Sequence, residues 1–176
     1  RYGYDGIEPR LDVNHAHGIE ADITAARRAK IAAQLERGRV KLACLATSIA
    51  YADPAKNDAM LRQTHARIDL AGDLHVPAIR VFGGIIPEGI EREQAVGNLA
   101  GALKAVADHA GERNVKVCIE THDDWCNPVH LAAVMRQVDH SAVRVNWDIM
   151  HPVCKSQTGV PEAFETLRQW IGHVHV

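Results

Sequence analysis

The sequence lacks the short motifs that would assign several function classes directly. No Gly-x-Gly-x-x-Gly or Gly-x-x-x-x-Gly-Lys-Ser/Thr loop follows any apolar run, so the dinucleotide-binding and P-loop classes lack their phosphate-binding signature. No apolar run reaches the roughly 18 residues that a membrane helix needs, and no signal-peptide pattern is visible. We therefore expect no membrane partner.

Paired cysteines and a charge excess of one sign are also missing. The four Cys form no Cys-x-x-Cys pair, and we interpret Cys44, Cys118, Cys126 and Cys154 as free thiols in a reducing, cytoplasmic compartment. Lys and Arg number 20 against 22 Asp and Glu, which gives a formal net charge of −2. This balance predicts no general surface for nucleic acid or anionic membranes.

Short apolar strands alternate with amphipathic helices along the whole chain. With 176 residues, 47% of them apolar, the chain is long enough for one domain with a sizeable core. The pattern predicts strands at 5–9, 40–47, 76–82, 115–120, 143–148 and 172–176. It predicts helices from an Asp22 N-cap to about Arg37, and over 55–74, 90–110, 128–138 and 161–170. In the helix 90–110, Val96, Leu99, Leu103, Val106 and Ala110 form one apolar face.

Strict strand–helix alternation with polar residues at the strand exits predicts an α/β fold, a (β/α)₈ TIM barrel. About six of the eight barrel strands are visible, and the chain opens without Met and stops inside a strand. We therefore expect residues 1–176 to be a single barrel domain that lacks the first and last strands.

Ligand-type side chains close three successive strands. Glu120, Asp148 and His175 follow one another at intervals of 28 and 27 residues, which suits one strand, one helix and two loops. Active groups of a parallel barrel lie at the C-terminal strand ends, so these three side chains should meet. Two carboxylates and an imidazole suit Mn²⁺, Mg²⁺, Co²⁺ or Zn²⁺. Taken singly, Glu120 or Asp148 could instead cap the segment that follows it.

Side-chain alternation along the strands predicts which neighbours share the barrel interior. Cys118 and His122 should point the same way as Glu120, Asn146 the same way as Asp148, and His173 the same way as His175. We expect His151 to turn back over the site from a loop and either contact substrate or support the metal ligands.

Glu8 at the first strand exit, together with His122 and His173, completes the set of candidate substrate-binding residues, although a lone His is more often an ordinary core or surface residue. Asp123, Asp124 and Trp125 are expected to form a solvated loop over the mouth of the site. Trp147 is expected to face the opposite way and pack under the helices.

Four fragments carry a family resemblance. The stretches GYDGIEP (3–9), CIETHDD (118–124), NWDIMH (146–151) and GHVHV (172–176) resemble the xylose-isomerase-like TIM-barrel superfamily. That superfamily holds sugar and sugar-phosphate isomerases and epimerases, inosose dehydratases, hydroxypyruvate isomerases and AP endonuclease family two. The resemblance spans essentially the whole chain, from the second barrel strand to the seventh.

The resemblance implies a role for individual residues. It makes Glu120 a metal ligand and a catalytic acid/base carboxylate, Asp148 and His175 further ligands, and His151 a substrate contact. The fourth ligand of the family, a Glu on the eighth strand, and an Arg that follows His-x-His would lie beyond Val176. The endonuclease branch has extra His ligands after its third and fourth strands, where this chain reads Ala46-Thr-Ser and Phe82-Gly-Gly. That difference, with the absence of a basic excess, argues against DNA repair.

The sequence and the resemblance together predict a divalent-metal-dependent isomerase or epimerase. The enzyme would act on a sugar or sugar phosphate through an enediolate, with Glu120 and His151 as catalytic residues. Alternatives are an inosose-dehydratase-type lyase and a non-catalytic barrel that binds sugar or serves as a scaffold. A homo-oligomer is possible, and no nucleic-acid partner is expected.

Overall fold

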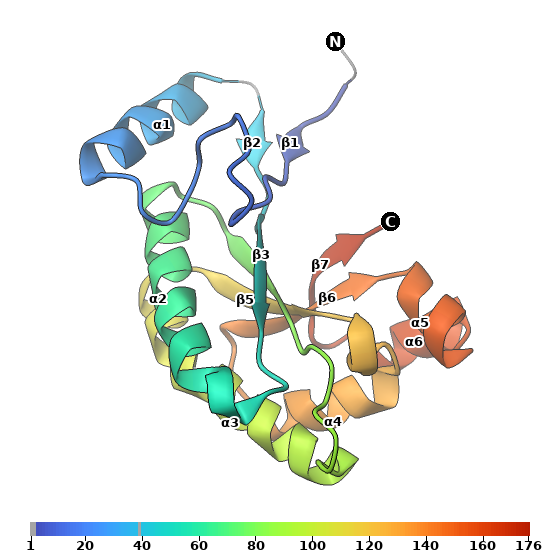
Figure 1. Cartoon of the computed structure of the whole chain (residues 1–176). Helices are drawn as coiled ribbons and strands as arrows, with labels where there is room; N and C mark the ends of the chain where they lie inside the picture. Colours follow the sequence, from blue (N-terminus) through green and yellow to red (C-terminus); the bar gives the residue numbers. More distant parts are fainter. Residues whose placement is uncertain (1–2, 39) are drawn as a thin grey trace.

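Parallel strands alternate with helices through residues 3–38 and 40–176, the residues that this computed structural model describes (Figure 1). The strands are β1 (Gly6–Ile7), β2 (Lys41–Leu42), β3 (Leu45–Ala50), β4 (Ala78–Phe82), β5 (Lys116–Glu120), β6 (Val143–Asp148) and β7 (Ile171–His175). The α-helices are α1 (Ala25–Arg37), α2 (Asn57–Asp73), α3 (Arg92–Glu112), α4 (Pro128–Val138), α5 (Met150–Ser156) and α6 (Val160–Leu167). Two 3₁₀ turns, η1 (Pro54–Lys56) and η2 (Asp123–Trp125), complete the described elements.

The strands follow one another in space in the order in which they occur in the chain. A five-stranded sheet has the order β3-β4-β5-β6-β7, and β1 pairs with β2 beside it. All of these pairings are parallel, and an isolated parallel bridge between Arg10 and Ala46 links the two parts. The predicted α/β fold of consecutive parallel strands is confirmed, and the described strands form part of a barrel wall.

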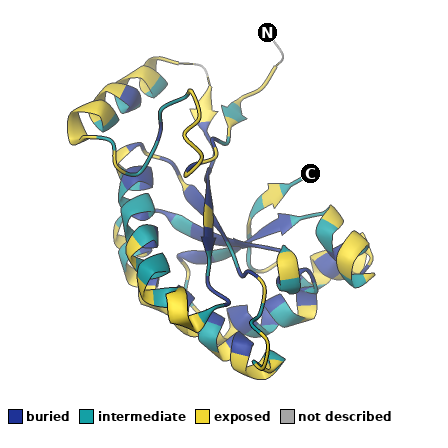
Figure 2. Cartoon of the chain, viewed as in Figure 1, coloured by how far each residue is buried: buried dark blue, intermediate teal, exposed yellow. Residues whose placement is uncertain are grey.

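The apolar core lies between the strands and the helices that cover their outer face. The five residues of the predicted apolar face of α3 are all buried, and so are the outward residues Ile79, Val81, Val117, Ile119, Val143 and Val145 of the strands. Figure 2 shows this division, with buried strands in the middle and exposed positions on the outer faces of the helices. The other side chains of the strands therefore face the barrel interior. Trp147 packs against Phe164 of α6, as predicted, with ring centroids 5.7 Å apart.

The second predicted strand differs from the structure. Instead of one strand over 40–47, the chain forms β2 and β3 and continues to Ala50, past the predicted loop start at Ser48. The division occurs where the pairing partner changes, because β2 pairs with β1 whereas β3 pairs with β4. The described residues therefore hold seven strands rather than six.

The helix boundaries differ mainly where a different residue provides the cap. Thr24, not Asp22, is the N-cap of α1, since its hydroxyl accepts a hydrogen bond from the amide of Arg27 at 3.2 Å. α4 begins at Pro128 after an Asn127 cap and ends at Val138, as predicted.

The segment after β6 contains a helix that the sequence did not predict. The short helix α5 occupies a stretch expected to be loop, and α6 ends at Leu167 instead of 170. Phe164 of α6 is 43% exposed, although its ring packs against that of Trp147. Among the described residues, no helix is both long and apolar enough to cross a membrane.

Candidate metal and active site

Glu120, Asp148 and His175 are each the last residue of their strand, on the neighbouring strands β5, β6 and β7. The register pairs Asp148 with His175 and Glu120 with Asn146, two residues before Asp148. Glu120 thus lies one inward-facing position below the other two, and all three lie at the C-terminal edge of the sheet. The interior alternation predicted from the sequence agrees with the contacts, since the amide of Asn146 lies 3.2 Å from Nδ1 of His175.

Glu120 lies at the centre of the cluster. It is 4% exposed, its Oε1 lies 3.2 Å from Nδ1 of His175, and the same oxygen lies 4.0 Å from Nδ1 of His151. Donor atoms of Glu120, Asp148 and His151 all lie within 4.8 Å of one another. Glu120 therefore lies near every other predicted ligand or catalytic residue. His175 belongs to the cluster through its contact with Glu120.

Asp148 caps a helix and faces the cluster at the same time. Its Oδ1 accepts hydrogen bonds from the amides of Met150 and His151 at 2.9 and 3.0 Å, which starts α5. Its Oδ2 lies 3.6 Å from the ring of His151, beyond hydrogen-bonding distance but close enough to share a ligand. The capping interpretation and the ligand interpretation of this residue are compatible, because each uses a different oxygen.

His151 lies on α5 rather than on a loop, and its ring has a fixed orientation. Nδ1 donates a hydrogen bond to the carbonyl oxygen of Thr121 at 2.9 Å. Because a carbonyl only accepts, the proton of the neutral ring lies on Nδ1 and Nε2 keeps its lone pair. Thr121 also exchanges hydrogen bonds with the main chain of Asp148, at 2.9 and 3.1 Å. This buried threonine ties the ends of β5 and β6 together, a role that no pattern in the sequence indicated.

A buried arginine is the other site residue that sequence reasoning missed. Arg80 of β4 is 7% exposed, and its Nη1 donates to the carbonyl oxygen of Thr47 at 2.6 Å. Its Nε lies 3.0 Å from Oε2 of Glu120, but the N–H is not directed at that oxygen, so neither atom has a hydrogen-bond partner within residues 3–38 and 40–176. Burial lowers the pKa of Arg80, while the charges of Glu120 and Glu8 oppose that change. A charged residue inside an apolar strand is the signal that could have found it.

Glu8 contacts both histidines of β7. Its Oε2 lies 2.8 Å from Nε2 of His173 and 3.1 Å from Nε2 of His175, and its Oε1 lies 3.2 Å from the latter. Burial alone would raise the pKa of the Glu8 carboxyl, but the hydrogen bonds from His173 and His175 outweigh it and lower the pKa to about 2. Hydrogen bonds to Glu120 and Glu8 raise the pKa of His175 to about 9.

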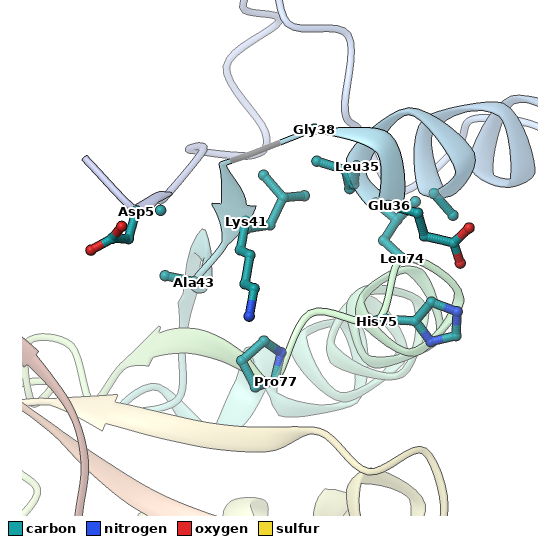
Figure 3. A pocket seen from close by; sticks show the side chains of 12 residues that line it. Asp5, Leu35, Glu36, Gly38, Lys41, Ala43, Leu74, His75 and Pro77 are labelled. Atoms are coloured by element: carbon teal, nitrogen blue, oxygen red, sulfur yellow. The ribbon is translucent and has the colours of Figure 1, made fainter. Parts of the chain in front are cut away.

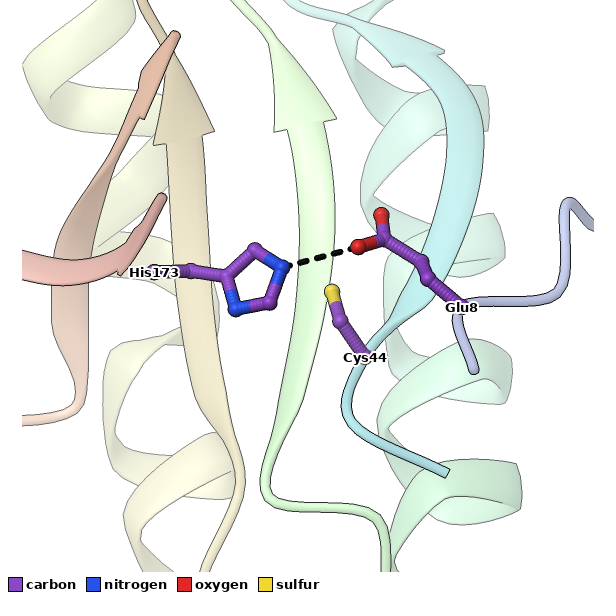
Figure 4. A group of neighbouring side chains, drawn as sticks. All are labelled: Glu8, Cys44 and His173. Atoms are coloured by element: carbon purple, nitrogen blue, oxygen red, sulfur yellow. Dashed lines mark hydrogen bonds and ion pairs between the residues drawn. The ribbon is translucent and has the colours of Figure 1, made fainter. Parts of the chain in front are cut away.

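Glu8, Cys44 and His173 form a second group whose donor atoms lie within 4.8 Å of one another. Figure 4 shows these three side chains pointing toward one another across the strands. Cys44 is fully buried, and burial followed by the charge of Glu8 raises the pKa of its thiol. This thiol is therefore protonated at neutral pH.

His122 borders a cavity beside the cluster rather than the cluster itself. Its ring packs against those of His151 and Phe82, each with centroids 4.6 Å apart, and its Nδ1 lies 2.9 Å from Oδ1 of Asp123. The cavity, of about 420 Å³, is lined by Ile85, His122, Asp123, Asp124, Cys126, His151 and Lys155. It is the space through which a substrate could reach His151.

The expected solvated loop at 123–125 is wrong at two of its three residues. Trp125 is fully buried in the 3₁₀ turn η2, and the carboxylate of Asp124 accepts a hydrogen bond from the amide of Ile86 at 2.7 Å. The physical reason is packing, because the indole lies where any side chain at Gly83 would stand. The segment is thus fixed to the loop that follows β4.

A larger cavity, of about 680 Å³, lies at the other ends of the strands (Figure 3). Its lining includes Gly6 and Lys41, the first residues of β1 and β2, and Pro77, which precedes β4. Because groups that act in a parallel barrel lie at the C-terminal strand ends, this cavity is separate from the candidate site.

Sequence comparison assigns the family. The model of the family described as xylose isomerase-like TIM barrel matches residues 1–176. The chain belongs to this family. No curated protein sequence matches this xylose isomerase-like chain detectably.

Solved structures share the fold of this xylose isomerase-like chain at low sequence identity. A D-psicose 3-epimerase crystallised with D-fructose has a TM-score of 0.81 and 18% identity, over 98% of this chain and 63% of that protein. The probable 3-DHS dehydratase AsbF of Bacillus anthracis has a TM-score of 0.78 and 19% identity, over 98% and 62%. A xylose isomerase-like TIM barrel protein from Mycobacterium smegmatis in complex with magnesium has a TM-score of 0.73 and 16% identity, over 99% and 62%. The chain thus spans a little under two thirds of the length of these relatives.

Proposed function

We propose that this chain belongs to a divalent-metal-dependent isomerase or epimerase that acts on a sugar or sugar phosphate. The observation that supports it is the convergence of Glu120, Asp148 and His175, at the ends of three neighbouring strands, with His151 of α5. Membership of the xylose isomerase-like family and the fold shared with a sugar epimerase point the same way.

The donor set fits a divalent cation. Glu120, Asp148 and His175 offer two carboxylates and one imidazole, and donor atoms of Glu120, Asp148 and His151 lie within 4.8 Å of one another. Oε2 of Glu120 forms an ion pair with Arg80 at 3.0 Å, which leaves Oε1, the oxygen beside His175, as the one that would hold the cation. A bound Mn²⁺, Mg²⁺, Co²⁺ or Zn²⁺ would polarise the carbonyl of an α-hydroxy carbonyl substrate.

The chain itself supplies the groups that move protons. Glu120 would take the proton from the carbon next to the carbonyl and return it, and burial beside Arg80 keeps its carboxylate in one orientation. His151 has Nδ1 committed to Thr121, so Nε2 is free to bind a substrate hydroxyl. Substrate contacts by His122, His173 and Glu8 stay predictions, as do a homo-oligomer, a cytoplasmic location and the absence of nucleic-acid binding.

A dehydratase is the second candidate. It is favoured by the fold shared with a probable 3-DHS dehydratase, and removal of a proton beside a carbonyl begins both reactions. The mass of the product distinguishes the two reactions. Dehydration gives a product lighter by one water, whereas isomerisation and epimerisation leave the mass of the substrate unchanged.

The test uses the full-length protein, stripped of metal and reloaded with each of the four cations. It is incubated in D₂O with a panel of ketohexoses and their phosphates. We expect deuterium to enter the carbon beside the carbonyl, and Glu120→Gln to slow this exchange by about 10²–10⁴-fold. Glu93→Gln, on the exposed face of α3, serves as the matched control and should retain the wild-type rate. Mass spectrometry and NMR measure the outcome. Loss of water would favour the dehydratase, and absence of both metal binding and exchange would leave the non-catalytic barrel.

A further inference from the structure

The carboxylate of Glu8 comes from the far end of the chain to meet the candidate ligand His175. The two residues are 167 positions apart, yet both oxygens of Glu8 lie 3.1–3.2 Å from Nε2 of His175. The opposite ring nitrogen, Nδ1, faces Oε1 of Glu120 at 3.2 Å. The imidazole therefore lies between two carboxylates, one at each nitrogen.

The two nitrogens of His175 have different surroundings. Glu8 approaches only through Nε2, whereas Nδ1 faces Glu120 and the cluster shared with Asp148. The amide of Asn146 lies 3.2 and 3.4 Å from the two nitrogens, so it does not select one of them. Each carboxylate can therefore hold one proton of the ring, Glu120 at Nδ1 and Glu8 at Nε2. A cation bound beside Glu120 would displace the proton of Nδ1 only, so Glu8 is the contact that would keep the proton on Nε2.

Glu8 is itself held in place by a second histidine. His173 lies 2.8 Å from Oε2 of Glu8, as the dashed line in Figure 4 shows. The side chain of Glu8 is 20% exposed, and the buried thiol of Cys44 lies beside it. With both oxygens engaged by the two rings, the carboxylate has little freedom to turn toward a substrate.

We propose that Glu8 is a positioning residue: it holds one proton of His175 on Nε2 and fixes the ring so that Nδ1, the nitrogen beside Glu120, is the one that would give up its proton to a bound cation. This inference rests on the proposed function, and the predicted substrate contact is the competing role of Glu8. Histidines that ligate metals commonly donate their other N–H to a carboxylate, which fixes the ring and its tautomer, and loss of that partner typically weakens metal affinity 10–100-fold.

Metal affinity of the full-length protein tests the inference. Calorimetric titration with Mn²⁺ should give a dissociation constant about 10–100-fold weaker for Glu8→Ala than for wild type. Glu8→Gln keeps an acceptor oxygen and should fall between the two, and Glu93→Gln should match wild type. If wild type binds Mn²⁺ and Glu8→Ala binds it equally well, the positioning role is overturned while the proposed function stands. If wild type binds no metal, both are overturned.

Two further readouts separate positioning from other roles. At saturating Mn²⁺, Glu8→Ala should recover most of kcat with an unchanged KM for the sugar, whereas a KM increase of tenfold or more would restore the substrate contact and overturn the proposal. Titration with Co²⁺ should show no sulfur-to-metal absorption band, since such a band would make Glu8 a ligand of a second site with Cys44.

A magnetic resonance measurement keeps the test independent of whether a variant folds. In the Zn²⁺-loaded wild-type protein, ¹⁵N shifts should show that His175 retains its proton on Nε2. Coordination through Nε2 instead would contradict the inference.

Discussion

Glu120 shows how much a single residue depends on its surroundings in this protein. In the sequence it is one carboxylate among 22 acidic residues. In the structure it is buried against Arg80 and His175, in a place where a charge without partners would be strongly unfavourable. The role of Asp148 also depends on its surroundings, because one of its oxygens caps α5 while the other remains available to the site.

At the same scale, Gly83 should tolerate no side chain. A Cβ there would stand 2.1 Å from Cδ1 of Trp125, which is fully buried and cannot move away easily. We expect Gly83→Ala to lower the free energy of unfolding by about 1–3 kcal/mol, the usual cost of overpacking. Urea denaturation followed by tryptophan fluorescence measures it.

Gly97 on the exposed face of α3 provides the control. A Cβ at that position meets nothing within 4 Å, so Gly97→Ala should stabilise the helix by up to about 1 kcal/mol. Equal stabilities of wild type and Gly83→Ala would show that Trp125 does not pack against Gly83.

At the scale of elements, an ion-pair network fastens three helices to one another. Asp73, the last residue of α2, accepts hydrogen bonds from Arg28 of α1, at 2.9 Å, and from Arg113, which follows α3. Partial burial would raise the pKa of Asp73, but these two arginines outweigh it, so that the pKa lies below its ordinary value of 3.8. The carboxylate therefore helps to hold α1 and α3 against α2.

Asp73→Asn should remove a pH-dependent part of the stability. A carboxyl whose pKa is lowered by folding stabilises the protein above its ordinary pKa, and that contribution disappears as the pH falls through the lower folded value. At pH 7 we expect the variant to be less stable by about 1 kcal/mol or less, the usual value for partly exposed ion pairs. The difference should shrink as the pH falls below 3.8. Urea midpoints at several pH values measure this.

Asp22→Asn is the matched control for that series. Asp22 is exposed and does not cap α1, so its replacement should leave the urea midpoint of the protein unchanged. A difference between Asp73→Asn and wild type that persisted unchanged to the lowest pH would contradict the ionic origin of the effect.

At the scale of elements, patterns with a local cause could be predicted from the sequence. α4 has both predicted bounds because Asn127, Pro128 and the apolar face all lie within its own segment. The division of β2 from β3 could not be predicted, since it depends on which strand lies alongside each half. α5 was missed although its stabilising contact is local, because Asp148, two residues before Met150, accepts hydrogen bonds from the amides of its first turn.

At the scale of the whole molecule, a bound cation should stabilise the folded protein. A ligand that binds only the native state at 100 times its dissociation constant adds about 2.7 kcal/mol. For a domain of this size that corresponds to roughly 5–10 °C in Tm. We expect Mn²⁺ to raise the Tm of the metal-free full-length protein by that amount, and EDTA to reverse the change.

The variant pair used for catalysis also controls the thermal experiment. Glu120→Gln should lose the Mn²⁺-dependent rise in Tm, whereas Glu93→Gln should keep it. An identical rise in all three proteins would place the bound metal somewhere other than at Glu120.

The sequence by itself determined the alternation of strands and helices, the apolar layer between them and the ligand-type residues at the strand ends, because these follow from local periodicity and capping. Only the tertiary structure decided which of those residues meet. Glu120 and His175 lie 55 positions apart, and Glu8 and His173 lie 165 apart. Their contacts depend on the curvature of the barrel wall, which brings β1 opposite β7. No pattern along the chain predicts how close these two strands come in space. The charge of Arg80 inside an apolar strand was visible in the sequence, but its partner was decided by the tertiary structure, since Glu120 belongs to another strand.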